Sequence, residues 1–515
     1  MRSAWIYRIR KHAVDIIALV CAFFMLCVVP LLFRDAFFDI NRVKVEAVIA
    51  TVPVLLFAFG AALLVRPQQD GHCSAKKSII VLMLTFLFSC VVSCALTGFE
   101  NATLTGSEGR YCGLYFMLCC GAAFFMISMG DRRLLRFTAV SAMICAAVCA
   151  GLGFVNAMGM DPLGFYVRIQ KGQETVFLST IGHFDFYGTY LVILFPLAGA
   201  FYVFSDPRML RYIGLVCTSV IAFGAMASRT DSAFAGLHLG CFMLLALAGG
   251  DYLRIARALS AWAMGFAALP LTYSLLQKSA FQLEFSGLPR IIFDLHAGEM
   301  AAALLIVLAG VCLLLHRRGS SAPGRKRWMV VLLLLFGLFA VAAGGVVFHF
   351  SVFDTSSSLG SASSFLRFND HWGSLRGFAW IRSIRAYGDY PLLKKLFGSG
   401  MELTLRVLTP YFDNPDMLVY GVFNDPHCQP LQMLLTCGLF GMASFVLFYV
   451  SMLVLLFRYA EDDPVLCGVL GSVWSYSVIM LINVTQPILI ATYFSICALG
   501  VACIRNDHLS GGVAA

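Results

Sequence analysis

The chain has 515 residues, of which 60% are hydrophobic and 13% are charged, and its formal net charge is +9 at pH 7. Soluble domains usually carry roughly twice that charged fraction, so the composition argues against a water-soluble fold. Continuous apolar runs of about 18 or more residues recur along the chain, which is typical of membrane-spanning helices and not of β-barrel strands.

Fourteen apolar runs of membrane length predict an all-α, polytopic membrane protein with about 12–14 transmembrane helices. They cover residues 12–33, 45–65, 78–97, 111–130, 134–155, 184–204, 212–227, 232–249, 258–276, 296–315, 328–350, 429–457, 464–484 and 487–504. We expect three parts: membrane helices 1–11 in residues 1–350, one long extracytoplasmic loop or cap in residues 351–428, and C-terminal membrane helices in residues 429–515.

The distribution of Lys and Arg predicts the orientation of these helices. With the N-terminus placed in the cytoplasm, 21 of the 37 basic residues fall in cytoplasmic segments, against 9 in the short outward loops. Because cytoplasmic loops are enriched in basic residues, we expect both termini in the cytoplasm. This asymmetry also accounts for the positive net charge, so no nucleic-acid partner is expected.

Two arginines on the expected outer face are candidate ligands for an anion. Arg229 lies in "MASRTDSAF", between two spans joined almost without a loop, and Arg376 lies in "SLRGFAWIRSIRAYG" of the long loop. A guanidinium group can bind a diphosphate bidentately. The alternatives are an anchor for lipid head groups at Arg229 and a solvated surface side chain at Arg376.

His427 lies in "FNDPHCQPLQ", at the end of the long loop and just before an apolar run. Pro426 disfavours helix at Asp425, so a helix is expected to begin just after this stretch. A neutral histidine at this water-accessible position is a candidate general base. The alternative is a polar cap on the membrane helix.

Several common catalytic motifs do not occur in the sequence. It has no P-loop, no dinucleotide fingerprint, no G-x-S-x-G elbow and no D-x-D pair on the expected outer face. Most of the 18 cysteines lie inside apolar runs, where they act as small apolar residues. We therefore expect no metal site and no cofactor.

Five stretches, taken together, resemble the O-antigen ligase and polymerase family. "NDPHCQPLQMLLTCGLFG" is similar to the family's histidine signature, and "RGFAW…GDYPLLKKLFGSG" to its preceding arginine element. "ASRTDSAFAGL", "STIGHFDFYGTYL" and "GRYCGL" are similar to three further elements. The matching positions are His427, Leu431, Gln432, Gly438, Gly441, Arg376, Trp380, Asp389, Pro391, Gly398, Gly400, Ser228, Arg229 and Arg110.

The sequence departs from the family pattern at a few of these positions. Cys428 follows His427 where the family has Asn, and His183 and Asp185 stand where the family usually has Asn. In the element that is usually Ser-Arg-Gly, two residues, Thr230 and Asp231, separate Arg229 from the next small residue. The departures point to a divergent member.

The resemblance implies an enzyme that moves a glycan from a polyprenyl diphosphate, such as undecaprenyl diphosphate, to an acceptor hydroxyl at the outer face of the bacterial cytoplasmic membrane. His427 would be the general base, with Asp425 as a possible orienting group. Arg229, Arg376 and Arg110 would stabilise the diphosphate. The expected partners are a lipid-linked glycan donor and a glycan, lipid or protein acceptor. A transporter or flippase, whose path would be lined by intramembrane charges, and a non-catalytic scaffold are the alternatives.

Overall fold

The computed structural model describes residues 2–65, 74–412, 423–484 and 486–504, and the described chain is almost entirely helical. Fourteen apolar helices correspond one to one to the fourteen expected spans. Their bounds are α1 Arg2–Phe23, α2 Ile40–Val65, α3 Ser74–Leu96, α5 Leu114–Ser128, α6 Arg132–Ala157, α7 Phe184–Phe204, α8 Arg208–Ala227, α9 Asp231–Leu247, α10 Tyr252–Gln277, α12 Ala297–Arg317, α13 Arg325–Val352, α19 Gln429–Tyr459, α20 Pro464–Ile482 and α21 Pro487–Cys503.

These helices confirm the prediction of an all-α polytopic membrane protein. Within the described residues, eleven spans are at least 18 residues long and apolar enough to cross a membrane. Helices α5, α9 and α21 are apolar but shorter. Helix α1 is extended to membrane length by a π-helical turn at Phe24–Val28 and a 3-10 turn at Val29–Leu31.

The remaining elements are short and lie between the long helices. The helices are α4 Asn101–Thr105, α11 Gly287–Asp294, α14 Ser363–Leu366, α15 Trp372–Gly388, α16 Leu392–Phe397 and α17 Thr404–Leu408, with 3-10 turns at Phe165–Arg168, Gly360–Ala362 and Thr409–Tyr411. Two strands, β1 Phe177–Leu178 and β2 Gly182–His183, pair antiparallel with Phe177 opposite His183.

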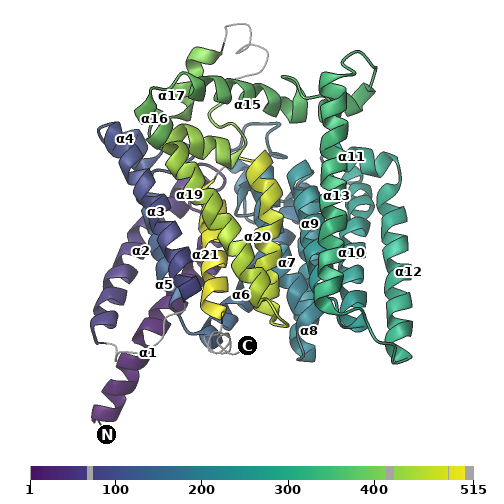
Figure 1. Cartoon of the computed structure of the whole chain (residues 1–515), viewed down its shortest axis with the longest axis horizontal. Helices are drawn as coiled ribbons and strands as arrows, with labels where there is room; N and C mark the ends of the chain where they lie inside the picture. Colours follow the sequence, from purple (N-terminus) through teal and green to yellow (C-terminus); the bar gives the residue numbers. More distant parts are fainter. Residues whose placement is uncertain (1, 66–73, 413–422, 485, 505–515) are drawn as a thin grey trace.

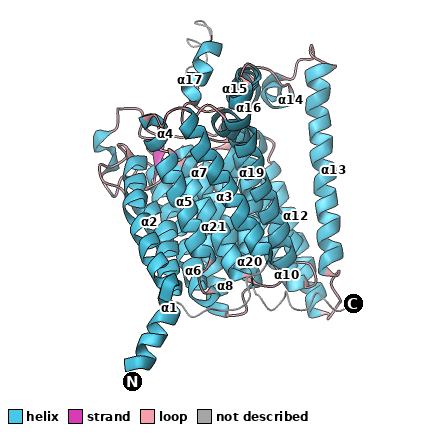
Figure 2. Cartoon of the chain, turned by 60° about the vertical axis from the view of Figure 1, so that its left-hand side comes forward, coloured by secondary structure: helices cyan, strands magenta, loops and turns pink. Residues whose placement is uncertain are grey.

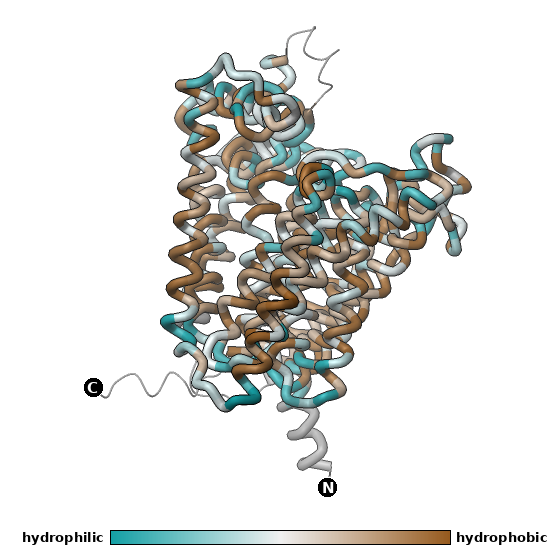
Figure 3. Tube along the Cα trace, turned by 90° about the vertical axis from the view of Figure 1, so that its right-hand side faces the viewer, coloured by the Kyte–Doolittle hydropathy of each residue, from teal (hydrophilic) through white to brown (hydrophobic). Residues whose placement is uncertain are grey.

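The long helices run side by side as one bundle, and helices α15, α16 and α17 lie together at one of its ends (Figure 1). Helix α1 starts at the opposite end (Figure 1). Hydrophobic residues dominate along the helices, while hydrophilic residues gather in the connections at both ends (Figure 3).

The three-part division, the location of both termini and the outward orientation of residues 351–428 remain predictions. Residues 66–73, 413–422 and 505–515, on which they partly rest, lie outside the described chain.

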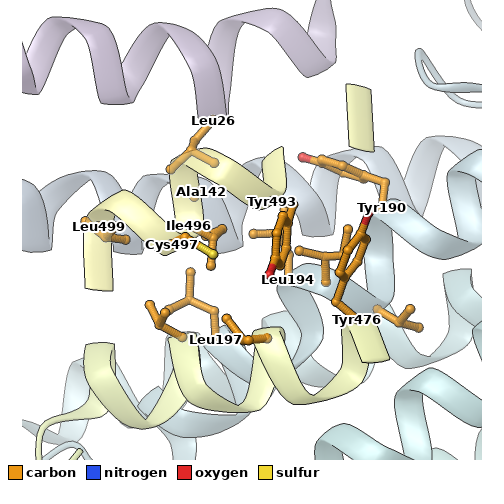
Figure 4. Close-up of a cluster of buried hydrophobic side chains, with 14 of the residues drawn as sticks. Leu26, Ala142, Tyr190, Leu194, Leu197, Tyr476, Tyr493, Ile496, Cys497 and Leu499 are labelled. Carbon is orange, nitrogen blue, oxygen red and sulfur yellow. The ribbon is translucent and has the colours of Figure 1, made fainter. Parts of the chain in front are cut away.

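The centre of the bundle is formed by α7, α20 and α21. Every residue of α21 is buried, and most of α7 and α20 is buried as well. Figure 4 shows how these helices pack, with the Tyr476 ring of α20 stacked on the Tyr493 ring of α21 at 4.1 Å between centroids. At the other extreme, α13 has no buried residue and stands at the edge of the bundle (Figure 2). Two of the central helices reach the candidate site described below, because α7 begins directly after His183 and the last turn of α20 contacts Arg376.

Helix α19 is interrupted at Gly438, whereas the sequence predicted an uninterrupted apolar span over 429–457. Gly438 has φ 68° and ψ −169°, a backbone conformation that is open essentially only to glycine. The break frees backbone carbonyls of the preceding turn. Ser399 N–H donates to Leu435 O at 3.0 Å, and Gly400 N–H donates to Thr436 O at 3.2 Å.

The two glycines at this crossing let the backbones approach closely. A Cβ atom at Gly398 would lie 2.2 Å from the carbonyl oxygen of Thr436, and one at Gly438 would lie 2.4 Å from that of Leu396. The loop that follows α16 is thereby fixed against the first half of α19. This contact fixes the long loop to the helix that begins two residues after His427.

Candidate active site

Three helices begin at the same end of the bundle, each directly after a polar residue of the candidate site. Helix α7 begins after His183, α9 begins two residues after Arg229, and α19 begins two residues after His427. Arg229 and His427 both adopt left-handed backbone conformations, with φ of 61° and 53°. Such φ values are uncommon outside glycine and concentrate at functional sites, where surrounding contacts hold them.

Arg229 lies against the start of α7 and the hairpin that precedes it. Its Nη2 donates to the backbone oxygen of Thr175 at 2.8 Å, and its guanidinium carbon lies 5.5 Å from the centroid of the Phe184 ring. Its Nε is buried and has no hydrogen-bond partner among the described residues. Burial holds the pKa of Arg229 below its ordinary value, while the nearby carboxylate of Asp185 acts in the opposite direction.

Arg376 reaches from α15 to the end of α20. Its Nε donates to the backbone oxygen of Ile482 at 2.6 Å, and its Nη1 donates to that of Gly373 at 2.5 Å. Burial lowers the pKa of Arg376, and the carboxylates of Asp185 and Asp231 raise it. The side chain is therefore a partly buried, oriented cation, in contrast to the solvated surface arginine that was the alternative interpretation.

The ring of His427 is oriented by the residue two positions before it. Its Nδ1 lies 3.0 Å from the backbone oxygen of Asp425. A carbonyl oxygen can only accept, so Nδ1 carries the proton and Nε2 keeps its lone pair. Burial lowers the pKa of His427, the Asp425 carboxylate raises it, and the charge of Arg376 lowers it further. A neutral imidazole with its lone pair on Nε2 is the form that a general base requires.

The side chain of His427 does not cap α19. The N-cap residue is Cys428, and its side chain makes no capping hydrogen bond either. Asp425 instead organises this turn, because its Oδ1 accepts the backbone N–H of His427 at 2.7 Å. Asp425 thus orients His427 through the backbone, and the intervening Pro426 does not prevent this.

Arg110 faces carboxylates of the protein itself. Its Nη2 donates to Asp425 Oδ2 at 2.7 Å, and its Nε lies 3.2 Å from Glu402 Oε2. The side chains of Arg110, Asp425 and Glu402 are at most 5% exposed. This geometry favours a positioning role for Arg110, in which it anchors the turn that carries His427, over direct contact with a diphosphate.

Two carboxylates near the arginines carried no predicted role. The carboxylate of Asp185 lies within electrostatic range of Arg229, Arg376 and His427. Asp231 Oδ1 accepts the backbone N–H of Leu288 at 2.7 Å, which attaches α11 to the start of α9. Asp185 lies two residues after His183, and Asp231 lies two residues after Arg229. This closeness in sequence to polar residues of the candidate site is the signal by which they could be predicted.

The residues expected to act together are therefore brought together, although they are widely separated in sequence. Arg229 and Arg376 lie within electrostatic range of Asp185, and Arg376 also acts on His427. Arg110 is connected to His427 through Asp425. Within the described residues, no group of three or more His, Cys, Asp or Glu side chains is arranged to hold a metal ion.

Part of the chain matches a known protein family. Residues 292–446 match the model of the family described as O-antigen ligase. The matched segment includes Arg376, Asp425 and His427, while Arg110 and Arg229 lie outside it. A search among curated proteins finds no match.

Proposed function

Because residues 292–446 match the O-antigen ligase family, we propose that the protein transfers a glycan from a polyprenyl diphosphate carrier to an acceptor hydroxyl. The acceptor is a sugar, a lipid or a protein side chain. The transfer would take place at the outer face of the bacterial cytoplasmic membrane, on the side where α15, α16 and α17 lie. The domain match favours this transferase over a transporter or flippase.

In the proposed reaction the acceptor oxygen attacks the anomeric carbon of the donor sugar. The new bond forms between these two atoms, and the bond from the anomeric carbon to the diphosphate oxygen breaks. The proton of the acceptor hydroxyl moves to Nε2 of His427, and the bonding electrons leave with the diphosphate. A single displacement of this kind inverts the anomeric centre.

The diphosphate leaves with additional negative charge, so the reaction is accelerated by cations placed where that charge develops. Arg229 and Arg376 are suited to this task because both are partly buried and oriented by backbone carbonyls. The Nε of Arg229 has no hydrogen-bond partner among the described residues, so this guanidinium keeps one donor that is not committed to the protein. The carboxylate of Asp185, which acts on both arginines in the absence of substrate, would be their counter-charge until the donor binds.

The observation that most supports the proposal is the orientation of His427. Its Nδ1 is bonded to a carbonyl oxygen, its pKa is lowered by burial, and Arg376 is close enough to act on it. The proposed base and the cation proposed to bind the diphosphate are thus within electrostatic range of each other. This is the arrangement that glycan transfer from a diphosphate needs.

The test is glycan transfer by purified protein, with a lipid-linked donor and turnover normalised to folded protein. His427→Asn should lower turnover by about 10²–10⁴, the usual contribution of a general base. The matched control is His296→Asn, because His296 also has a left-handed backbone, with φ 52°, but is exposed and remote from the arginines in sequence. Asparagine tolerates this backbone conformation at both positions. If the turnover of His427→Asn were close to that of the control, His427 would not be the general base.

A further inference from the structure

A second polar site lies at the end of the bundle opposite the candidate active site. An open pocket of about 590 Å³ is lined there by the start of α6, the α7–α8 turn and the α19–α20 turn. Its volume is in the range of pockets that hold small molecules. The α6 and α8 labels mark this end in Figure 1, away from α15, α16 and α17.

One wall of the cavity is cationic. Arg132 and Arg136 both pair with Asp463, which also accepts the backbone N–H of Val465 at 2.8 Å. One carboxylate therefore faces two guanidinium groups, and the cluster of Arg132, Arg136 and Asp463 carries one net positive charge. Arg132 Nε is buried and finds no hydrogen-bond acceptor in the part of the chain that the structure describes.

A buried hydroxyl in the lining also lacks a partner. Ser205 lines the cavity, is 4% exposed, and its Oγ has no hydrogen-bond partner among the described residues. Buried polar groups are normally hydrogen-bonded, and leaving one unsatisfied is costly. Ser205 and Arg132 are thus two lining residues whose buried donors have no acceptor among the described residues, and each would gain one from a bound polar group.

The rest of the lining combines exposed carboxylates with apolar side chains. Asp206 and Glu461 are exposed acidic residues at the cavity, in addition to the carboxylates that pair with arginines. The apolar part includes Phe137, Phe201 and Phe204. A ligand that matches this lining carries an anion, a cation and a hydrocarbon chain.

We propose that this cavity binds a zwitterionic aminophospholipid of the phosphatidylethanolamine class. The phosphate is bound by Arg132 and Arg136 and accepts from Ser205, and the ammonium group lies against Asp206 and Glu461. The first part of one acyl chain packs on the phenylalanines. The lipid is a structural partner that fastens α6 to the α19–α20 turn, and its binding is independent of the glycan transfer proposed above.

The test measures lipid binding by the purified full-length protein in detergent. Phosphatidylethanolamine, phosphatidylglycerol and inorganic phosphate are added separately, and bound lipid is counted by native mass spectrometry together with the shift in Tm. Two variants change the site differently: Arg136→Gln removes one phosphate ligand, and Val140→Phe fills the apolar wall without altering charge. Arg133→Gln is the control, because Arg133 is an exposed arginine of the same helix that does not line the cavity.

We expect phosphatidylethanolamine to raise the Tm of the wild type and of Arg133→Gln. We expect binding about tenfold weaker or more in Arg136→Gln, which loses a hydrogen bond to a charged group, and also in Val140→Phe. Equal binding of phosphatidylglycerol would show that the carboxylates do not recognise an amine and would overturn the proposal. So would stabilisation by phosphate alone, or unchanged lipid binding in Val140→Phe.

Discussion

The guanidinium of Arg110 and the carboxylate of Asp425 form a buried ion pair at 2.7 Å, although 315 positions separate them in the sequence. The pair joins the segment before α5 to the turn that carries His427. Asp425 uses its other carboxylate oxygen to accept the backbone N–H of His427. The orientation of the proposed base therefore depends on a contact between distant parts of the chain.

Removal of Arg110 should destabilise the protein strongly. Arg110→Gln leaves the carboxylates of Asp425 and Glu402 buried without their cation, which typically costs about 3–5 kcal/mol. Arg406→Gln is the matched control, since Arg406 pairs with Glu100 at the same 2.7 Å but on the surface. Exposed pairs contribute about 0–1 kcal/mol. Thermal unfolding in detergent measures both variants. If Arg110→Gln were as stable as Arg406→Gln and lost only donor affinity, Arg110 would be a diphosphate ligand after all.

The acid limb of the pH–rate profile should report His427. Its pKa is lowered from the ordinary value, chiefly by burial and also by Arg376, so the ring stays neutral, and able to accept a proton, to a more acidic pH than a free histidine. Activity should therefore fall only below about pH 6.5. In Arg376→Gln the residual activity should begin to fall at a higher pH, because a charge that disfavours protonation is gone. An acid limb that does not move in this variant would argue against His427 as the titrating group.

Lysine should not replace arginine at Arg229 and Arg376, the two positions proposed to bind the diphosphate. Arg376 uses Nε and Nη1 to hold two backbone carbonyls, and an ammonium group cannot reproduce that planar arrangement. Arg376→Lys and Arg229→Lys should therefore remain impaired, with turnover lowered by about tenfold or more. Arg385→Lys, an exposed position on the same helix as Arg376, should be close to wild type. Full activity in both site variants would mean that only a general positive field is needed.

The break in α19 should not tolerate a side chain. Gly438→Ala places a Cβ about where the Leu396 backbone lies and forces an unfavourable φ, so we expect a lowered Tm and loss of transfer. Gly310→Ala is the control, because nothing lies within 4 Å of its added Cβ inside helix α12. That change should be neutral or stabilise by about 0.5–1 kcal/mol. A Tm for Gly438→Ala equal to that of Gly310→Ala would contradict the described crossing.

The proposed orientation can be read from cysteine labelling in intact cells. Ser356→Cys lies after α13 on the expected outer side, and Ser320→Cys lies between α12 and α13 on the expected inner side. Both positions are exposed, whereas the native cysteines of the described residues are all at least partly buried. A membrane-impermeant maleimide should label only Ser356→Cys. Labelling of Ser320→Cys alone would invert the topology.

The helices could be predicted from the sequence because continuous apolar runs leave the backbone few alternatives in a membrane. The interruption at Gly438 could not be predicted, since a glycine inside an apolar run does not reveal that another backbone crosses there. Residue type and a family resemblance predict His427, Arg229 and Arg376 as candidate site residues. The pairing of Arg110 with Glu402 could not be predicted, because only the tertiary structure brings these distant residues together.

The three helix starts at the candidate site have an electrostatic consequence. The peptide dipoles of α7, α9 and α19 each place about half a positive charge at the end that follows His183, Arg229 and His427. These partial charges belong to backbone N–H groups, so unlike a side chain they keep their sign at every pH. They offset the carboxylates of Asp185 and Asp231 without adding a titratable group. The attraction of the site for a phosphate oxyanion should therefore persist in alkaline solution, where imidazole and ammonium groups have lost their charge.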